Sequence, residues 1–254
     1  MNKTIKLISW NVNGIRAIAK KNFLEFLAEI DADIVCLQET RATYDQIPPA
    51  LKEIPGYTAY FISAERGGYS GVAMYSKLKP QNVKIGLDIP CFDKEGRIII
   101  ADFGEWQLFN CYFPNGGASL ERLEYKMAFY EATLAYAKEH PKLIICGDVN
   151  TAHQEKDLAR PKENQQVSGF LPMERAWIDK LLSVGYVDTF RLFNQDGNNY
   201  SWWDMKTRAR DRNIGWRIDY FFAGPEVKEK VKDAFILPQI LGSDHCPVGI
   251  KLSI

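Results

Sequence analysis

The sequence alternates between short apolar runs and segments whose apolar residues recur at helical spacing. Residues 4–10 (TIKLISW) and 143–146 (LIIC) are mainly apolar, have the length of a strand and are followed by turn residues. On the same grounds we predict further strands at 33–37, 57–62, 71–75, 97–103, 106–112, 187–190, 217–223, 234–240 and 246–254. Strands are therefore expected to dominate the fold.

Three segments instead have the spacing of amphipathic helices. The first covers 16–30, the second follows the N-cap candidate Ser119 and stops before Pro141, and the third begins near Pro172 and ends before Gly185. The apolar faces that we expect to be buried are Phe23, Phe26, Leu27 and Ile30; Leu123, Met127, Tyr130 and Leu134; and Met173, Trp177, Leu181 and Val184. Polar loops are predicted at 153–169 and 194–215.

This order of elements favours an α/β sandwich of two packed mixed sheets with helices outside, because strands outnumber helices and the two halves of the chain look alike in outline. The 254 residues are 46% hydrophobic and include six Trp, enough for a substantial core. No stretch has the composition of a linker, so we expect residues 1–254 to form a single domain.

Charge and cysteine content narrow the partners and the compartment. The net charge is zero, with 32 basic and 32 acidic residues, so an anionic partner would have to be bound by local basic residues or by metal ions. The five Cys include no CxxC pair, which is typical of core residues in a reducing compartment. The N-terminus does not resemble a signal peptide, and no apolar run has transmembrane length. We expect a cytoplasmic protein, or a nuclear one in a eukaryote, that does not bind membranes.

Polar side chains follow the predicted strands. Asp148 and Asn150 come directly after the run LIICG, and they would point the same way if the chain stayed extended. A carboxylate beside an amide is able to hold a water and a phosphate oxygen, although an ordinary polar turn has the same pattern. The arrangement recurs at other strand ends, with Asp219 inside a strand: Asn11 and Asn13, Glu39, Tyr112 and Asn115, and Asp244 and His245.

These side chains predict a site for a hard cation. Carboxylates and amides without Cys or paired His suit Mg²⁺, and Mg²⁺ is typical of phosphoryl transfer. Of the three histidines, His140 is expected to cap a helix and His153 to make structural hydrogen bonds. His245 differs, because a carboxylate such as Asp219 would orient its ring to donate to a phosphate oxygen.

Motifs along the whole chain resemble the exonuclease III family of apurinic/apyrimidinic (AP) endonucleases, within the endonuclease/exonuclease/phosphatase superfamily. The matching motifs include SWNVNGIRA (9–17), CLQET (36–40), YFPNG (112–116), CGDVNTAH (146–153), SGFLPMERAWID (168–179), NIGWRIDYFF (213–222) and GSDHCP (242–247). The resemblance implies a four-layer sandwich and Mg²⁺-dependent cleavage of double-stranded DNA on the 5′ side of an abasic site, leaving a 3′-OH. It also implies some 3′→5′ exonuclease activity and cleaning of 3′-blocked ends, with Mn²⁺ as a possible substitute.

The resemblance also implies a role for each residue of the constellation. Glu39 is expected to be the principal metal ligand, with Asn11 and Asp244 beside the metal. Asp148 is expected to orient or deprotonate the attacking water, and Asn150 and Asn11 to hold the water or the phosphate. His245, paired with Asp219, is expected to stabilise charge on the phosphate, and Tyr112 to act near the developing charge.

Further positions match substrate-binding residues of the family. Trp202, Trp216 and Ile218 correspond to a pocket for a flipped-out abasic sugar, whereas we expect Trp203 to pack in the core. Asn115 is expected to bind a phosphate. Candidates for contact with the DNA backbone are Lys20, Lys21, Arg66, Arg122, Lys126, Arg160, Lys162, Lys206, Arg208 and Arg210.

Two positions depart from animal members of the family. Asn13, expected to contact substrate, replaces an Asp, and a neutral amide weakens a second metal site, so we expect one essential Mg²⁺. Ala118 and Lys206 stand where animal enzymes insert larger side chains into the duplex, which leaves open how this protein opens damaged DNA. Arg208 is the nearby candidate.

Two other functions fit part of the pattern. A different phosphodiesterase of the superfamily, such as a nonspecific DNase I-like nuclease, an inositol-phosphate phosphatase or a sphingomyelinase, would use the same acid, amide and His set. The Trp-rich segment 200–218 and the motif SGFLPMER argue against it. A non-catalytic protein that binds damaged DNA is disfavoured, because competent residues fill the expected catalytic positions. We expect a monomer.

Overall fold

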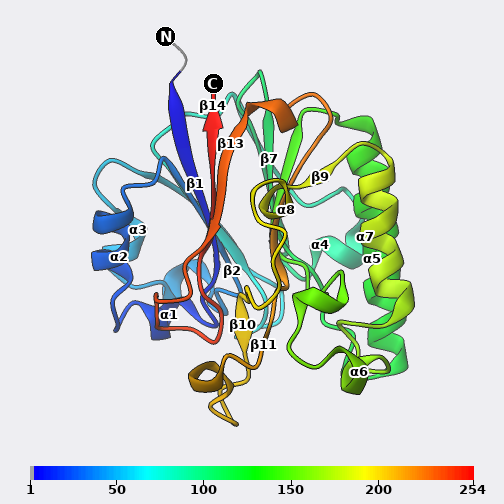
Figure 1. Ribbon diagram of the computed structural model, residues 1–254. Coiled ribbons are helices and arrows are strands. Elements are labelled where there is room, and N and C mark those ends of the chain that lie inside the picture. The colour runs from blue at the N-terminus through cyan, green and yellow to red at the C-terminus, as the bar shows by residue number, and fades with distance from the viewer. Residues whose placement is uncertain (1–2) are drawn as a thin grey trace.

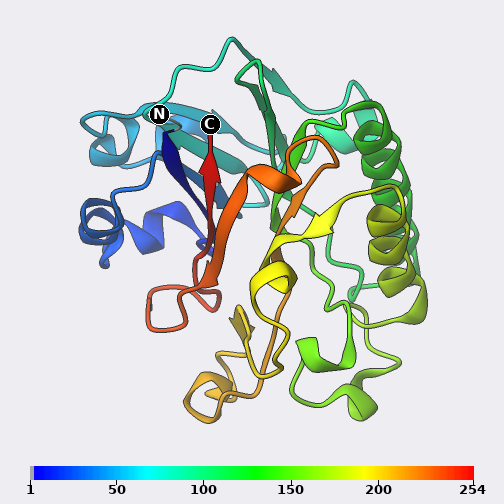
Figure 2. The same ribbon diagram turned by 45° about the horizontal axis from the view of Figure 1, so that its top comes forward.

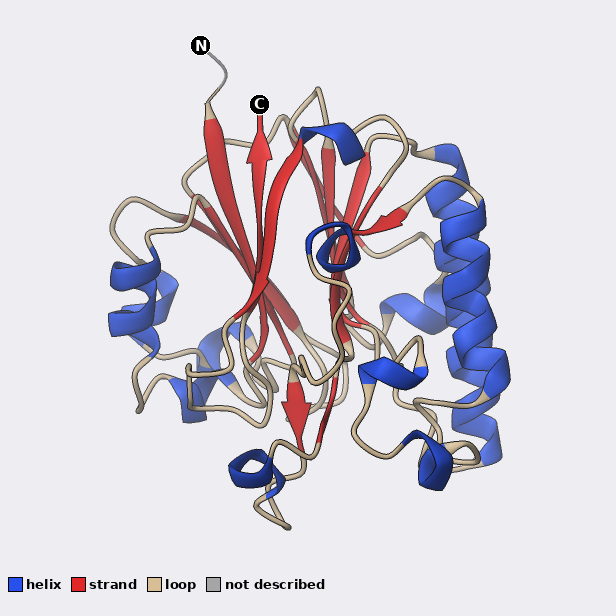
Figure 3. Cartoon of the chain, in the orientation of Figure 1, coloured by secondary structure: helices blue, strands red, loops and turns tan. Residues whose placement is uncertain are grey.

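Two six-stranded sheets pack face to face, with helices on their outer faces, in the computed structural model, which describes residues 3–254 (Figures 1 and 3). Helices α1 to α3 cover one sheet and the long helices α5 and α7 cover the other (Figure 1). This confirms the predicted α/β sandwich and its four layers. Among the described residues, no helix combines the length and apolar character needed to cross a bilayer.

The first sheet has the strand order β13-β14-β1-β2-β4-β3. Strands β1 and β2 are parallel, with Leu7 opposite Ile34, and the remaining pairs are antiparallel. The bounds are β1 (Thr4–Asn11), β2 (Ile34–Gln38), β3 (Thr58–Ile62), β4 (Val72–Ser76), β13 (Val231–Ile236) and β14 (Val248–Ser253).

The second sheet has the order β5-β6-β7-β8-β12-β9, and its central pair β7 and β8 is parallel. Asp148 lies opposite Tyr112 on one side and Asp219 on the other. The bounds are β5 (Asn82–Ile85), β6 (Ile98–Asp102), β7 (Gln107–Tyr112), β8 (Leu143–Asp148), β9 (Val187–Asp188) and β12 (Asp219–Ala223). A separate two-stranded ribbon, β10 (Trp202–Trp203) with β11 (Gly215–Trp216), projects beyond the sheets (Figures 1 and 2).

Most helices are short. The α-helices are α1 (Ile15–Ile18), α2 (Phe23–Ile30), α3 (Pro49–Lys52), α4 (Pro90–Asp93), α5 (Leu120–Glu139), α6 (Pro161–Asn164), α7 (Pro172–Ser183) and α8 (Thr189–Phe193). The 3₁₀ turns are η1 (Tyr44–Gln46), η2 (Glu155–Asp157), η3 (Ala209–Arg212) and η4 (Lys228–Lys230). As predicted, Ser119 caps α5, where its hydroxyl accepts a hydrogen bond from the Arg122 amide.

Three apolar layers hold the sandwich together. The layer between the sheets contains Ile99, Ile144 and Ile250, which are fully buried. Central strands are buried on both faces, which is why they are continuous apolar runs rather than alternating ones. Under α5 and α7, Tyr130 and Trp177 stack with ring centroids 4.2 Å apart, and the Trp177 indole donates to the Tyr130 carbonyl.

Several predicted boundaries were wrong for identifiable reasons. The helix predicted at 16–30 is split into α1 and α2, because Ile18 and Phe23 are both buried but would lie about 140° apart on one continuous helix. The strand predicted at 187–190 ends at Asp188, where α8 begins, since a run of four residues does not distinguish strand from helix. Strand β5 was missed, and β10 and η3 lie within the predicted loop 194–215.

The buried face of α7 was also partly wrong. Met173 is 49% exposed, and the buried position beside it is Glu174. Glu174 is tolerated there because its carboxylate pairs with the equally buried Lys126 at 2.6 Å and accepts further bonds from Ser168 and from the Gly169 and Leu171 amides. Lys126 is therefore unavailable to DNA, which corrects the prediction that it contacts the backbone.

A buried charge network anchors the segment that leads into β12. The Arg217 guanidinium, 1% exposed, donates from Nε to Asp157 at 2.8 Å and from Nη2 to Asp188 at 2.6 Å. Although burial alone would raise the pKa of Asp157, Arg217 and Arg191 lower it to about 2. The network fixes the chain immediately before Ile218 and Asp219.

We predict that Arg217→Met destabilises the protein by about 3–5 kcal/mol, because Asp157 and Asp188 are left buried without their partner. Urea unfolding measures this, with Arg160→Met as the control, since the Arg160–Glu163 pair is exposed and worth less than about 1 kcal/mol. The stabilisation from Asp157 is complete above its unfolded-state pKa of about 3.9 and is lost as the pH falls toward 2. The free energies of unfolding of the wild type and of Arg217→Met should therefore approach each other at acidic pH. Equal stability at neutral pH would contradict the assignment.

Candidate active site

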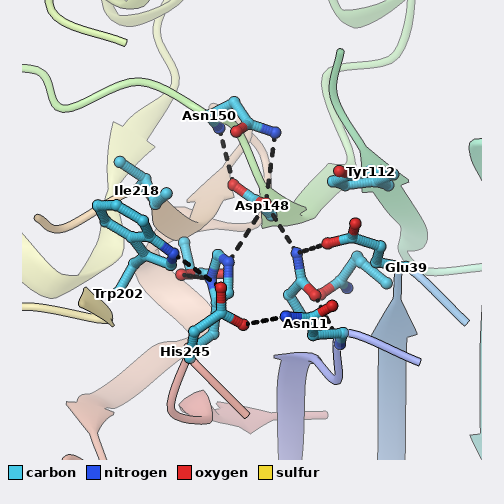
Figure 4. Close-up of polar contacts among 12 residues, drawn as sticks. Asn11, Glu39, Tyr112, Asp148, Asn150, Trp202, Ile218 and His245 are labelled. Atoms are coloured by element: carbon cyan, nitrogen blue, oxygen red, sulfur yellow. Dashed lines mark hydrogen bonds and ion pairs between the residues drawn. The ribbon is translucent and has the colours of Figure 1, made fainter. Parts of the chain in front are cut away.

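The polar side chains predicted from strand ends gather at one end of the sandwich, where both sheets contribute (Figure 4). Asn11 ends β1 and Glu39 follows β2 in the first sheet, while Tyr112 ends β7 and Asp148 ends β8 in the second. Because both pairs of strands are parallel, their carboxyl ends meet at a common edge. Face-to-face packing of the sheets then brings the two sets of side chains together.

Backbone conformation at these strand ends differs from the extended chain expected for 148–150. Asn150 adopts a left-handed φ of 55°, and its backbone N–H donates to Asp148 Oδ1 at 2.8 Å. The same turn recurs after β1, where Asn13 has a φ of 47° and its backbone N–H donates to Asn11 Oδ1 at 3.0 Å. Asn tolerates this region because its short side chain bonds locally.

Glycine also has a role that the sequence did not reveal. Gly147 lies inside β8 rather than ending it, and has a φ of 136°. A Cβ there would lie 1.8 Å from the Cys111 carbonyl oxygen on the neighbouring strand. Only glycine allows β7 and β8 to approach this closely next to Asp148.

Asp148 accepts hydrogen bonds from both Asn11 and Asn150. Asn11 Nδ2 donates to Asp148 Oδ2 at 2.9 Å and to Glu39 Oε2 at 3.0 Å, so that one amide joins the two sheets (Figure 4). Burial and the neighbouring charge of Asp219 raise the pKa of Asp148 to about 7, against the opposing effects of His245 and of the bonds from Asn11 and Asn150. A carboxylate with this pKa is suited to accept a proton near neutral pH.

His245 lies between two carboxylates. Its Nδ1 is 2.8 Å from Asp219 Oδ2, and its Nε2 is 3.8 Å from Asp148 Oδ2. Burial alone would lower the pKa of His245, but Asp219 and Asp148 raise it to about 10. At neutral pH the ring is therefore an imidazolium that donates from Nδ1 to Asp219, while its Nε2–H lies too far from Asp148 for a hydrogen bond.

Asp148, Asp219 and His245 also lie close enough together to share a metal ion. A His245 bound to metal would be a neutral imidazole that binds through Nε2, since Nδ1 is engaged by Asp219. In the absence of a cation, the trio consists of a hydrogen bond between His245 and Asp219 and an ion pair between His245 and Asp148.

Glu39 has the environment that a hard cation requires. Its carboxylate faces the pocket, and Arg41 donates to Oε1 from Nε at 3.0 Å and also from Nη2, so a positive charge already neutralises it. Asp244 also lines the pocket, and its oxygens accept hydrogen bonds from Asn13 Nδ2 and from Trp202 Nε1. Although burial favours the neutral acid, His245 and these bonds lower the pKa of Asp244.

Tyr112 forms the rim beside Glu39. The Arg97 guanidinium lies 4.7 Å from the centroid of the Tyr112 ring, and it donates to the Tyr112 carbonyl. Burial, together with the charges of Glu39 and Asp148, raises the pKa of Tyr112 well above its usual range. The phenol therefore keeps its proton and is a hydrogen-bond donor. Arg122 lies nearby but is paired with Glu95 at 2.8 Å.

An apolar wall completes a cavity of about 330 Å³ opposite Glu39. Trp202 and Trp216 meet edge to face with centroids 6.4 Å apart, and Ile218 lies beside them. Figure 4 shows Trp202 and Ile218 on the same side as His245. Trp203 is instead 2% exposed in a separate apolar cluster, which confirms its predicted place in the core.

The remaining predicted residues occupy three settings. Asn13 and Asn115 line the cavity, and Asn115 Nδ2 donates to Asn150 Oδ1 at 3.1 Å. Lys206 and Arg208 are exposed in the loop after β10 and do not line the cavity. Arg210 is half-buried and donates to the carbonyls of a neighbouring loop, which makes it a structural residue. The other DNA-contact candidates are exposed: Lys20, Lys21, Arg66, Arg160 and Lys162.

Sequence reasoning missed four residues of the site. Arg41 and Arg97 support Glu39 and Tyr112, Val167 lines the apolar side, and Ser201 contacts Asp219. Arg41 stands two positions after Glu39, a spacing that signals a possible local ion pair. The other three carry no local signal, because their partners lie far away in the sequence.

Comparison with known proteins agrees with this geometry. The model of the endonuclease/exonuclease/phosphatase family matches residues 8–245. The chain belongs to this family. It is 44% identical to an exodeoxyribonuclease of Bacillus subtilis over 98% of this chain and 100% of that protein.

Two solved structures also resemble this family member over nearly its whole length. An AP endonuclease from Archaeoglobus fulgidus superposes with a TM-score of 0.89 at 28% identity, covering 98% of this chain and 100% of that one. The 3′ phosphatase NExo from Neisseria, solved with a product DNA hairpin, gives the same TM-score and identity and covers 98% and 99%. The chain is therefore a nuclease that acts on DNA. Nucleases of this family depend on a metal ion, and the acidic cluster described above is consistent with one.

We predict a bell-shaped pH dependence for the chemical step, because Asp148 must be ionised and His245 protonated. The single-turnover rate should rise through about pH 7 and fall near pH 10. A bound cation favours the carboxylate, so saturating metal should move the acid limb to lower pH. If the residual activity of Asp148→Asn still rose through about pH 7, the assignment of the acid limb to Asp148 would be contradicted.

Proposed function

We propose that this nuclease is a DNA-repair AP endonuclease, which hydrolyses the phosphodiester on the 5′ side of an abasic site and leaves a 3′-OH. The observation that carries the proposal is the apolar wall of Trp202, Trp216 and Ile218 directly beside His245 and Asp148. A nonspecific nuclease has no need of such a wall. A sugar without its base can enter a small apolar cavity, whereas an intact nucleotide brings a base that does not fit.

In the proposed reaction, the scissile phosphate lies between Asp148, His245 and Tyr112. Asp148 takes a proton from a water that Asn11 and Asn150 help to hold, and the water oxygen attacks phosphorus. The bond between phosphorus and O3′ breaks, the phosphate stays on the abasic sugar, and the leaving O3′ takes a proton from solvent water to become the 3′-OH. The His245 imidazolium, held by Asp219, and the Tyr112 phenol donate to phosphate oxygens as negative charge builds up.

Glu39 is the proposed principal ligand of a single Mg²⁺, with Asn11 and Asp244 beside it and Mn²⁺ as a possible substitute. The donor set fits a hard cation, because it consists of carboxylate and amide oxygens at the mouth of an open cavity. When bound, the ion supplies positive charge to the phosphate and the leaving oxygen. Asn13 adds no charge, which is why we propose one ion.

Substrate contacts complete the proposal. Asn115 binds a phosphate, while Asn13 contacts the substrate from the loop after β1. Arg122 and the exposed Lys206 and Arg208 contact the DNA backbone or the opened duplex. Arg122 is already paired with Glu95, so its proposed contact requires a shared or exchanged ion pair.

The decisive experiment is incision of a duplex that carries one abasic-site analogue, beside an undamaged duplex of the same sequence. With Mg²⁺ we expect cutting 5′ to the analogue, little cutting of undamaged DNA and none in EDTA. Glu39→Ala should lower the rate by at least ~100-fold, because the ion provides several kcal/mol of charge stabilisation. The control is Glu105→Ala, an exposed acid at the far end of β7.

Alternative outcomes separate the rival functions. Equal cutting of both duplexes would indicate a nonspecific DNase I-like nuclease. Tight binding to the abasic duplex without cutting under any metal would indicate a damaged-DNA-binding protein. Release of nucleotides or phosphate from 3′ ends measures the 3′→5′ exonuclease and 3′-end-cleaning activities that we propose as accompaniments.

We further predict that Arg208 inserts into or clamps the opened duplex. Its side chain is 86% exposed, and its backbone is left-handed with a φ of 51°. Arg208→Ala should weaken binding to abasic duplex by about 1 kcal/mol, roughly fivefold in Kd. The control is Lys138→Ala, an exposed charge in the last turn of α5, and unchanged affinity for Arg208→Ala would remove the residue from this role.

Four broader features are also proposals. We propose that residues 1–254 act as a single domain and as a monomer, with damaged double-stranded DNA as the partner. The five free cysteines, four of them buried, fit a reducing compartment, so we propose a cytoplasmic location, or a nuclear one in a eukaryote.

A further inference from the structure

Ser201 lies where three parts of the site meet. It is fully buried and immediately precedes the ribbon strand β10. Its amide donates to the Trp216 carbonyl at 2.9 Å, and its carbonyl accepts from the Cys246 amide at 2.8 Å. The backbone of Ser201 therefore connects the Trp ribbon to the segment that carries His245.

The Ser201 hydroxyl has a fixed direction. Its oxygen accepts hydrogen bonds from the Ile218 and Asp219 amides, each at 3.1 Å. Both of these partners can only donate, so the hydroxyl proton must point to the remaining neighbour, Asp219 Oδ2, at 2.6 Å. All of the hydrogen-bonding capacity of the hydroxyl is thereby used.

Asp219 depends on this bond. Its Oδ2 is shared between the Ser201 hydroxyl and His245 Nδ1, while its buried Oδ1 has no hydrogen-bond partner among residues 3–254. Within the described residues, the orientation of the carboxylate is therefore set by two contacts. Without the hydroxyl, His245 alone would hold Asp219, and a buried carboxylate with one partner is free to turn.

We propose that Ser201 is a positioning residue that couples the apolar pocket to the His245–Asp219 pair. The inference rests on the proposed function, in which the pocket receives the abasic sugar and His245 donates to the phosphate. Ser201 adjoins Trp202 in the chain, bonds Trp216 through its backbone and bonds the Ile218 amide through its side chain. Ser201 thus links all three residues of the pocket wall to Asp219, the carboxylate that orients His245.

The proposal predicts a defect in the chemical step rather than in DNA binding. Ser201 has no exposed surface, so it does not touch substrate. Loss of its hydroxyl lets Asp219 turn, and His245 Nε2 is then aimed less well at the phosphate. Lesion binding between Trp202 and Trp216 should remain close to normal.

The test compares Ser201→Ala with Thr189→Val. Thr189 is an equally buried hydroxyl that donates to the Phe221 carbonyl on the same strand β12, but it lies away from the site. Both variants remove one buried hydroxyl bonded to that strand, so Thr189→Val reports the effect of lost stability alone. Ser201→Thr, which keeps a hydroxyl at this position, tests rescue.

Three quantities are measured for each protein. They are the single-turnover incision rate with Mg²⁺, the Kd for abasic duplex in EDTA, and the low-field proton NMR signal of His245 Nδ1–H, assigned by its loss in His245→Gln. For Ser201→Ala we expect a rate at least ~10-fold lower, a Kd within about threefold, and a shifted or broadened proton signal. Thr189→Val should keep the wild-type rate and signal, and Ser201→Thr should recover most of both.

Two results would overturn the proposal. One is Ser201→Ala with a rate within about twofold of wild type and an unchanged proton signal. The other is a rate loss that simply follows the folded fraction, as Thr189→Val would show for a purely structural hydroxyl. Wild-type protein that fails to cut abasic DNA would reject the proposed function instead, and the proton signal would still decide whether Ser201 holds Asp219 in place for His245.

Discussion

The active end of this molecule depends on bringing several carboxylates together without letting their repulsion push the sheets apart. The Asn11 amide does this most directly, because it donates to Glu39 on its own sheet and to Asp148 on the other. The hydrogen bonds stabilise both charges and fix the spacing between the sheets at the strand ends. The position of Asn11 follows in turn from the parallel pairing of β1 with β2. This pairing places Asn11 opposite Gln38, the residue that immediately precedes Glu39.

Two positively charged side chains, His245 and Arg41, offset the negative charge of the carboxylates, and each defines one part of the site. Around Asp148 and Asp219, the buried His245 is held as an imidazolium by two carboxylates, which suits it to donate a hydrogen bond. Around Glu39, the exposed Arg41 provides charge that a cation would supply during the reaction. The two parts meet at Asn11, so the proposed acid–base chemistry and the proposed cation site share one hydrogen-bonded amide.

Sequence patterns predicted most of the strands, the sandwich and most of the polar residues of the cavity, because buried parallel strands leave continuous apolar runs and end in polar turns. They did not predict the left-handed turns at Asn13 and Asn150, since an Asn reads equally well in an extended chain. Lys126 looked like a DNA contact because its burial depends on Glu174, 48 positions away. The role of Ser201 was not predicted for the same reason, since an isolated serine forms no sequence pattern and only the tertiary structure places it beside Asp219.

The central claim is that a base-free sugar occupies the apolar wall while the neighbouring 5′ phosphate faces Asp148 and His245. A crystal structure of the Glu39→Ala protein with an abasic duplex, grown in EDTA to prevent cleavage, tests it most directly. The account predicts the sugar between Trp202, Trp216 and Ile218, with the 5′ phosphate within hydrogen-bonding distance of His245 Nε2. An abasic sugar that stayed stacked in the duplex, or a phosphate away from His245, would contradict it.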